Sequence, residues 1–217
     1  MAELHYNTVT PLLLKALKTL MAAPDFYAFR LVGGTALSLY KGHRQSVDID
    51  LFTDAPYQSI DFEAIDVFLR ATYPHVEAND FREIGFGKSY YLGENENEIV
   101  KIDLFYTDAF VDTIEIIDDV RLATVEEIIA MKLSVVIRGG RKKDFWDIHE
   151  LMDAYSPDEM FALHARRCPY EHEKENLKKN FTNFEIADGE PDPICLRGKH
   201  WELIKADTID FLSLIHI

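Results

Sequence analysis

Apolar and polar positions show two periodicities along the chain. Up to about residue 123, segments with helical spacing of the apolar residues are interspersed with segments in which apolar and polar residues alternate strictly, as in SVDIDLF at 46–52. From Thr124 to Cys168 only helical spacing recurs, with capping-box patterns at Thr124–Glu127 and Ser156–Glu159. Spacings of three and four residues mark a helix face, and spacings of two mark a strand face. The pattern therefore predicts helices over 8–23, 35–42, 59–73, 124–138, 142–155 and 156–168, and strands over 26–32, 46–52, 75–107 (ending in a hairpin at 88–107) and 113–123.

These two periodicities predict one fold class with two regions. We expect an α/β (α+β) fold in which residues 1–123 form a small mixed β-sheet with flanking helices. Residues 124–217 are expected to form a helical region packed on this core. Within it, the segment 169–217 shows no periodicity that predicts a particular element. A chain of 217 residues is long enough for one generous domain or two small ones.

Composition and charge narrow the class of protein. With 47% hydrophobic and 28% charged residues, the chain can bury a core and is not typical of disordered proteins. The net charge of −15 argues against a broad basic groove for nucleic acid, but not against a local basic cluster. No apolar run approaches the roughly 20 residues that span a bilayer, and the N-terminus lacks the basic region of a signal peptide. Two cysteines without C-x-x-C spacing are typical of the reducing cytoplasm, where we expect this protein.

Two aspartates lie one residue apart in an otherwise apolar strand. Side chains two positions apart share a strand face, so Asp48 and Asp50 project together. Asp103, in the later strand VKIDLFY, shares its face with Lys101 and Phe105. If the two strands are neighbours, three carboxylates converge, and at least one should resist ionisation in the absence of cations. Such a group suits Mg²⁺ or Mn²⁺ and is the arrangement that a two-metal nucleotidyl transfer requires.

A Gly-Gly pair precedes these aspartates. Gly33 and Gly34 follow a predicted strand and open a short helix, where the backbone can approach a phosphate and N–H groups are unpaired. Thr35 adds a hydroxyl there, and Ser46 shares the strand face of Asp48. A D-x-D alone is most often a solvated strand edge, and a Gly-Gly alone is most often a turn. Their order along the chain favours a metal and nucleotide site.

The most apolar predicted helix carries a single charge in its middle, Lys132. A lysine at such a position often packs its apolar stem on the protein surface and extends its ammonium into water. The alternative is a point charge on a triphosphate. Basic residues follow at Arg138 and Lys143, and Asp144 and Asp147 then share one helical face. This segment is either a capped helix with a charged surface or a second part of the nucleotide site.

Both segments carry a family resemblance. GGTALSLYKGHRQSVDIDLF resembles the signature of the DNA-polymerase-β-like nucleotidyltransferase superfamily, and its GHRxSxDIDLF part is similar more narrowly to the AbiEii/AbiGii-type toxins. The later segment resembles the second block of that family, with valine at positions 135 and 136 where the family tends to have alanine. Its matching residues are Lys132, Arg138, Lys143, Asp144 and Asp147. The resemblance covers about residues 29–155.

The residues and the resemblance together imply a function and a set of site residues. They imply a nucleotidyltransferase core in residues 1–123 that transfers a nucleoside monophosphate from an NTP to an acceptor. The implied catalytic residues are Asp48, Asp50, Asp103 and Lys132, with the three aspartates as ligands of Mg²⁺ or Mn²⁺. The implied nucleotide-binding residues are Gly33, Gly34, Thr35, Ser46, Arg138, Lys143, Asp144 and Asp147.

The resemblance also implies partners, and alternatives remain open beside it. The implied partners are an RNA acceptor such as tRNA and a cognate antitoxin of a type IV toxin–antitoxin or abortive-infection system, with no membrane partner. One alternative is a nucleotide-binding or antitoxin-binding module without turnover. The other is a transferase that acts on a small-molecule or protein hydroxyl.

Overall fold

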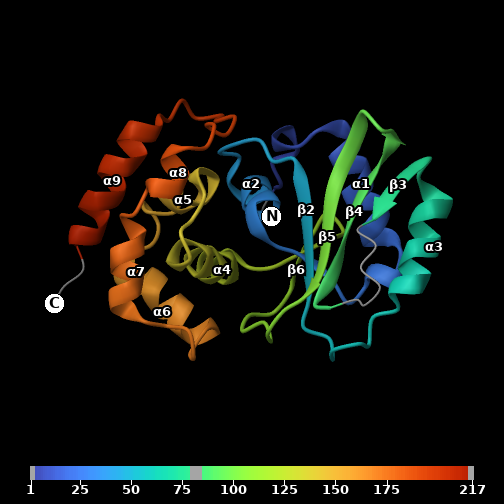
Figure 1. Cartoon of the computed structure of the whole chain (residues 1–217), viewed down its shortest axis with the longest axis horizontal. Helices are drawn as coiled ribbons and strands as arrows, with labels where there is room; N and C mark the ends of the chain where they lie inside the picture. Colours follow the sequence, from blue (N-terminus) through green and yellow to red (C-terminus); the bar gives the residue numbers. More distant parts are fainter. Residues whose placement is uncertain (1–2, 79–84, 215–217) are drawn as a thin grey trace.

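The computed structural model describes residues 3–78 and 85–214 and contains the predicted mixed sheet followed by helices (Figure 1). The strands are β1 (Arg30–Leu31), β2 (Asp48–Thr53), β3 (His75–Ala78), β4 (Gly87–Asn95), β5 (Glu98–Tyr106), β6 (Glu115–Ile117) and β7 (Val120–Leu122). The helices are α1 (Pro11–Ala22), α2 (Gly33–Lys41), α3 (Phe62–Thr72), α4 (Val125–Ile137), α5 (Lys142–His149), α6 (Pro157–Arg167), α7 (Lys174–Phe181), α8 (Glu185–Asp188) and α9 (Trp201–Ser213), with short 3₁₀ helices η1 (Tyr6–Thr8) and η2 (Pro24–Phe26). The predicted α/β fold class is confirmed.

The strands form a seven-stranded sheet in the order β3-β4-β5-β2-β1-β7-β6. β2 runs parallel to β5, and β1 runs parallel to β7; the other neighbouring pairs are antiparallel. The hairpin predicted over 88–107 is the β4–β5 pair. The central place of β2 puts the D-x-D strand between two neighbours, where its backbone is held on both sides.

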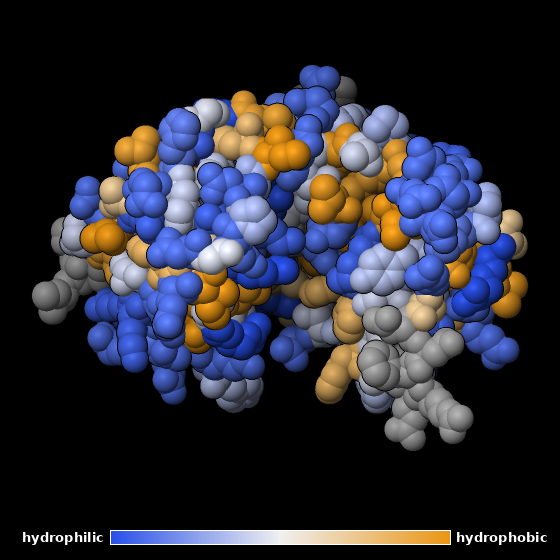
Figure 2. Space-filling model, turned by 45° about the horizontal axis from the view of Figure 1, so that its top comes forward, coloured by the Kyte–Doolittle hydropathy of each residue, from blue (hydrophilic) through white to orange (hydrophobic). Residues whose placement is uncertain are grey.

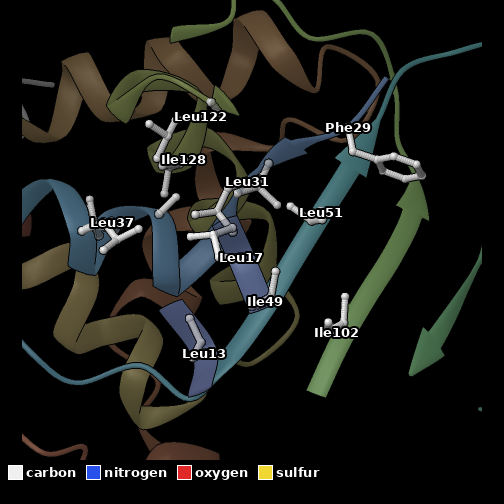
Figure 3. Packing of buried hydrophobic residues seen from close by; sticks show 14 of the residues in the cluster. Leu13, Leu17, Phe29, Leu31, Leu37, Ile49, Leu51, Ile102, Leu122 and Ile128 are labelled. Carbon is white, nitrogen blue, oxygen red and sulfur yellow. The ribbon is translucent and has the colours of Figure 1, made fainter. Parts of the chain in front are cut away.

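One face of the sheet is buried under helices. Strand alternation on β2 buries Ile49 and Leu51, which meet Leu13 and Leu17 of α1 and Leu37 of α2 (Figure 3). The amphipathic pattern of α1 supplies this contact, because its buried residues recur at helical spacing, and Thr10 caps its start by accepting from the Leu13 N–H at 3.2 Å. The other face of β2 is left only partly covered and is the one that carries the aspartates.

The C-terminal helices are joined to the sheet region through α4 and α5. α4 contacts α2, α6 and α7, and α5 contacts α2, α8 and α9. These helices lie together on the side of β2 away from β4 and β5 (Figure 1). Trp146 of α5 stacks on Trp201 of α9 with ring centroids 6.5 Å apart. A rigid helical wall therefore stands beside the D-x-D strand.

Two predicted elements are shorter than the pattern indicated. The strand predicted over 26–32 is limited to Arg30–Leu31, because the Tyr27 and Phe29 N–H groups bond back three residues and form turns. Those turns bury Phe26 and Phe29 in the core. The helix predicted over 142–155 ends at His149, and a series of tight turns follows it.

The first predicted capping box is only half formed. Thr124 does cap α4, since its hydroxyl accepts from the Glu127 N–H at 3.1 Å. The Glu127 carboxylate accepts instead from the Val111 and Asp112 N–H groups and from Arg167. The second box, at Ser156 and Glu159, is complete. Residues 79–84 of the predicted strand region lie outside the described residues. Across the described ranges, no helix is both long and apolar enough to cross a membrane.

Candidate active site

The predicted aspartates lie side by side on the partly open face of the sheet. β2 and β5 pair in parallel, with Asp50 opposite Asp103 and Asp48 opposite Lys101. Neighbouring strands are about 4.8 Å apart, and opposite residues in register point to the same face. The expectation that Asp48, Asp50 and Asp103 share a face on adjacent strands is therefore confirmed, but the expectation that they face one cavity is not, because Asp50 and Asp48 line two neighbouring cavities. We refer to these three residues as the aspartate cluster.

Asp50 is the centre of the aspartate cluster. Burial, followed by the neighbouring charges of Asp48 and Asp103, raises the pKa of Asp50 to about 6. The expectation that one carboxylate resists ionisation is met at this residue. The free energy stored in this repulsion is available to any cation that binds between the carboxylates.

The two outer aspartates already have cationic partners. Burial opposes ionisation of Asp48, but the Lys143 ammonium at 3.2 Å and the more distant Arg44 lower its pKa overall. Asp103 accepts a hydrogen bond from the Ser89 hydroxyl at 2.6 Å and pairs with Lys101. Lysine therefore compensates part of the negative charge in this structure.

The Gly33–Gly34 pair is where the chain passes from β1 into α2. Gly33 has φ +68°, and a Cβ added there would lie 2.7 Å from Asp50 Oδ2. At Gly34 an added Cβ would overlap the Arg44 guanidinium. A side chain would thus be strained at the first position and blocked at the second. Only glycine allows the start of α2 to lie directly against Asp50, which brings unpaired helix N–H groups to the aspartate cluster.

A buried ion network lies behind these glycines, and Asp147 of α5 is its hub. Arg44 donates to both Asp147 oxygens, at 2.6 and 2.8 Å, and Lys132 Nζ lies 2.6 Å from Oδ2. Lys132 also pairs with Asp144 at 2.7 Å, and His43 Nε2 lies 2.8 Å from Asp147 Oδ1. Burial alone would raise the pKa of Asp147, but Arg44 and Lys132 hold it well below its usual range. The network ties the α2–β2 segment to α4 and α5.

Lys132 is fixed in this network and does not reach along the surface. Its residue exposure is 5%, and its ammonium is shared by two carboxylates. Burial works against its charge, yet Asp147 and Asp144 raise its pKa overall. The alternative of a surface lysine with a solvated head is therefore wrong.

Thr35 and Ser46 also lie behind the site. Thr35 is fully buried, and its hydroxyl donates to Ser46 Oγ at 2.8 Å and contacts the Asp48 carbonyl. This contact joins α2 to the first residue of β2. In this arrangement neither hydroxyl faces the cavity beside Gly33, so the two residues set the position of Asp48.

A cavity of about 410 Å³ opens beside Gly33 and Asp50. Five of the described residues that line it are cationic, in a chain with a net charge of −15. They are Lys132, Arg138, Arg141, Lys143 and Arg167. The surface is hollowed between the C-terminal helices and the strands (Figure 2). Phe52, Met131 and Val135 also line it. Anion-binding groups together with apolar groups suit a nucleotide.

The predicted site residues divide between the cavity and its surroundings. The cavity is lined by Gly33, Gly34, Asp50, Lys132, Arg138, Lys143 and Asp144. Asp48 and Ser46 line a neighbouring cavity of about 380 Å³, which shares Arg141 and Lys143 with the first. Asp103 lies on the adjoining strand, and Thr35 and Asp147 support the site from behind.

Three contributors were not among the predicted site residues. Arg44 and Arg141 stood next to predicted residues in the chain, but nothing in the pattern indicated that Arg44 is buried against Asp147. Lys101 was placed on the face of Asp103 by strand phase, and its pairing with that carboxylate follows from the phase.

The donor atoms suit a hard divalent cation. Within residues 3–78 and 85–214, no cluster of three or more His, Cys, Asp or Glu side chains is arranged to hold a metal ion. Mg²⁺, however, usually takes one or two protein carboxylates and completes its shell with water and substrate phosphates. Asp48 and Asp50 offer that donor set, and the raised pKa of Asp50 reflects its burial and the neighbouring carboxylates of Asp48 and Asp103, whose repulsion a cation would relieve.

Comparison with known proteins identifies one matching family and several similar structures. A family model described as "Nucleotidyl transferase AbiEii toxin, Type IV TA system" matches residues 15–213. JHP933 from Helicobacter pylori is similar in structure with a TM-score of 0.58 and 22% identity, over 94% of this chain and 89% of that one. The nucleotidyltransferase toxin MenT4 from Mycobacterium tuberculosis H37Rv is similar with a TM-score of 0.54 and 15% identity, over 91% and 84%. These two likenesses concern the fold. A search of curated proteins found no match.

Proposed function

The chain belongs to the AbiEii family of nucleotidyltransferase toxins, and on this premise we propose that it transfers a nucleoside monophosphate from an NTP to an acceptor hydroxyl. The observation that carries the proposal is the contact between the Gly33–Gly34 start of α2 and Asp50, beside a cavity rich in basic side chains. In this proposal residues 1–123 provide the nucleotidyltransferase core, and residues 124–217 provide the helical wall of the nucleotide cavity.

The donor NTP lies in the cavity with its phosphates toward Gly33 and Gly34. Unpaired N–H groups at the start of α2 bind phosphate oxygens. Lys143, Arg141 and Arg138 neutralise the triphosphate, and Lys143 exchanges its contact with Asp48 for one with phosphate. The base lies against the apolar lining residues Phe52, Met131 and Val135. Lys132 adds positive charge from behind, held in place by Asp144 and Asp147.

The aspartate cluster would hold Mg²⁺ or Mn²⁺ together with the nucleotide. When bound, such ions supply Lewis-acid stabilisation of the phosphoryl oxygens and lower the pKa of the attacking hydroxyl. Asp48 and Asp50 orient the donor side, and Asp103 orients the acceptor hydroxyl. The hydrogen bond from Ser89 and the pair with Lys101 fix the carboxylate of Asp103 for this task.

The acceptor in this proposal is RNA, and the biological role is that of a toxin controlled by a separate antitoxin. MenT4, a structural neighbour, is a nucleotidyltransferase toxin, which supports the role by analogy only. The net charge of −15 argues against a long basic groove and favours an RNA contact made by a local cluster of basic residues.

The proposal is tested by incubating the full chain with each α-labelled NTP, Mg²⁺ and total RNA. We expect label in RNA from at least one NTP. Asp25→Asn, which changes an exposed aspartate outside the site, should label RNA at the wild-type rate. Tight NTP binding without label in RNA, in protein or in small molecules would instead indicate a binding module without turnover.

Metal and nucleotide should stabilise the fold together. Repulsion within the aspartate cluster is relieved by a divalent cation, and a ligand that binds only the folded state stabilises it by mass action. At 100 times Kd this amounts to about 2.7 kcal/mol, or roughly 5–11 °C in melting temperature for a chain of this size. Differential scanning fluorimetry with millimolar Mg²⁺ and each NTP measures the shift. An unchanged melting temperature for every pair would contradict the site.

A further inference from the structure

The aspartate cluster has a second flank that the donor cavity does not use. In the sheet order, Asp50 on β2 has β1 and the Gly33 turn on one side and Asp103 on β5 on the other. Attacking and leaving oxygens lie roughly in line across the transferred phosphorus. With the triphosphate cradled at Gly33, the acceptor must therefore approach from the Asp103 side, over β5 and β4.

The register of β4, β5 and β2 arranges this flank as three rows of side chains. The middle row holds Ser89, Asp103 and Asp50, which face each other across the three strands. The row on one side of it holds Tyr91, Lys101 and Asp48. The row on the other side holds Gly87, Phe105 and Phe52. Successive rows on one face are about 7 Å apart, so one aromatic ring lies on each side of Asp103.

The Phe105 and Tyr91 rings remain partly accessible, and the Phe105 ring is packed against its neighbours. Phe105 packs edge-on against Phe52 with centroids 6.1 Å apart. It also lies over β4, since a Cβ added to Gly87 would be 2.6 Å from its Cδ1. Tyr91 and Phe105 are both only half-buried, although they stand on central strands. Two aromatic rings left accessible beside a catalytic carboxylate are surfaces on which a flat base can stack.

One cation accompanies these rings. The side chain of Lys101 is 40% exposed, and it pairs with Asp103. Among the described residues of β4 and β5, Lys101 is the accessible ammonium on this face, which suits one phosphate and not a polyphosphate chain. Stacking rings, one cation and a carboxylate that accepts from a hydroxyl match a single nucleotide at the end of an unpaired strand.

Resting on the proposed function, we propose that the β4–β5 flank is the acceptor subsite, here called the acceptor face (Ser89, Tyr91, Lys101, Asp103, Phe105). It binds the terminal nucleotide of an unpaired RNA. The base stacks on Tyr91 or Phe105, the adjoining phosphate meets Lys101, and a ribose hydroxyl reaches Asp103. In the transfer, that hydroxyl oxygen forms the bond to the α-phosphorus, the bond to the β-phosphate oxygen breaks, pyrophosphate leaves, and the hydroxyl proton passes to Asp103 or water.

The test separates acceptor binding from donor binding. The rate of label transfer is measured while total RNA is titrated by mass at saturating NTP, and then while NTP is titrated at fixed RNA. At least one of Tyr91→Leu and Phe105→Leu should raise the RNA concentration for half-maximal rate about 10-fold or more, as expected for a lost stacking contact, and the affected variant identifies the ring that stacks on the base. The NTP concentration for half-maximal rate should stay within about 2-fold, since neither ring lines the donor cavity.

Matched variants distinguish stacking from general damage. Tyr91→Phe keeps the ring and should retain the wild-type RNA titration within about 3-fold. Tyr27→Ala removes a ring that is 60% exposed on another element and should change nothing. Melting temperatures of all variants, with and without NTP, show whether each one folds and binds the donor.

Each outcome bears on one of the two proposals. Label in RNA with unchanged RNA titrations for both leucine variants would overturn the acceptor face and leave the proposed function standing. Label entering casein, as a source of protein hydroxyls, and not RNA would overturn the acceptor face and the RNA acceptor, and leave nucleotidyl transfer itself standing. No label from any NTP in either acceptor would overturn the proposed function, and the acceptor face with it.

Discussion

Asp50→Asn is expected to reduce nucleotide transfer by about 10³-fold or more while leaving the protein folded. The substitution removes the central carboxylate of the aspartate cluster, which lies against Gly33 and opposite Asp103. Loss of one preorganised electrostatic contact in a transition state typically costs about 10²- to 10³-fold, and a weakened metal site adds to this. Label incorporation under single-turnover conditions measures the loss, with Asp25→Asn as the matched aspartate control.

The same substitution should raise stability in metal-free buffer. The folded pKa of Asp50, about 6, lies above the ordinary aspartate value, so the charged form destabilises the folded state. The penalty is complete above about pH 6 and disappears as the pH falls toward 4. Two pKa units correspond to about 2–3 kcal/mol. Asp50→Asn should therefore melt several degrees higher than wild type at pH 8 and at nearly the same temperature at pH 4. A lower melting temperature at pH 8 would show that Asp50 is a structural partner and not a strained functional carboxylate.

Lys132→Met is expected to be the most destabilising single change in the site. Methionine fills the apolar stem, but Asp144 loses its closest cation and Asp147 loses one of two. Breaking a buried ion pair on one side typically costs about 3–5 kcal/mol, or roughly 6–20 °C in melting temperature. We also expect a transfer loss of about 10²-fold or more in the fraction that stays folded. Lys15→Met, at an exposed pair, should leave the melting temperature nearly unchanged.

A double variant identifies the cause of this destabilisation. Lys132→Met combined with Asp144→Asn removes both sides of one pair, so the buried carboxylate is no longer left without its cation. The double variant should be more stable than the sum of the single effects by about 1–3 kcal/mol in urea unfolding. Strict additivity would show that the ammonium and the carboxylate do not interact, and the ion pair could then not be the cause.

The sequence was most informative where a single local periodicity determines which side chains share a face. The two-residue phase of a strand placed Asp48 with Asp50, and Asp103 with Lys101, before any pairing was known. The Gly33–Gly34 pair likewise predicted where α2 begins, and the capping box at Ser156 predicted where α6 begins. These features depend on neighbours within a few residues, so local rules are sufficient to predict them.

The hydrophobic pattern could not predict contacts between segments that are distant in the chain. Lys132 has the same local sequence whether its ammonium reaches water or Asp147, and only the packing of α4 on α5 decides between them. Arg44 and Asp147 are 103 residues apart in the chain, yet they form the buried bidentate pair that joins β2 to the helical wall. Thr35 carries a hydroxyl suited to phosphate, but the fold turns it toward Ser46. In each case the partner decides the role, and it comes from a different part of the chain.

Transfer of a nucleoside monophosphate at the aspartate cluster is tested most directly by the position of the label. Wild-type protein is incubated with Mg²⁺, total RNA and the same NTP labelled either at the α- or at the γ-phosphate. We expect α-label to enter RNA while γ-label is released as pyrophosphate, and we expect Asp50→Asn to abolish both. Transfer of γ-label to the acceptor, or α-label incorporation that persists at the wild-type rate in Asp50→Asn, would contradict nucleotidyl transfer at this site.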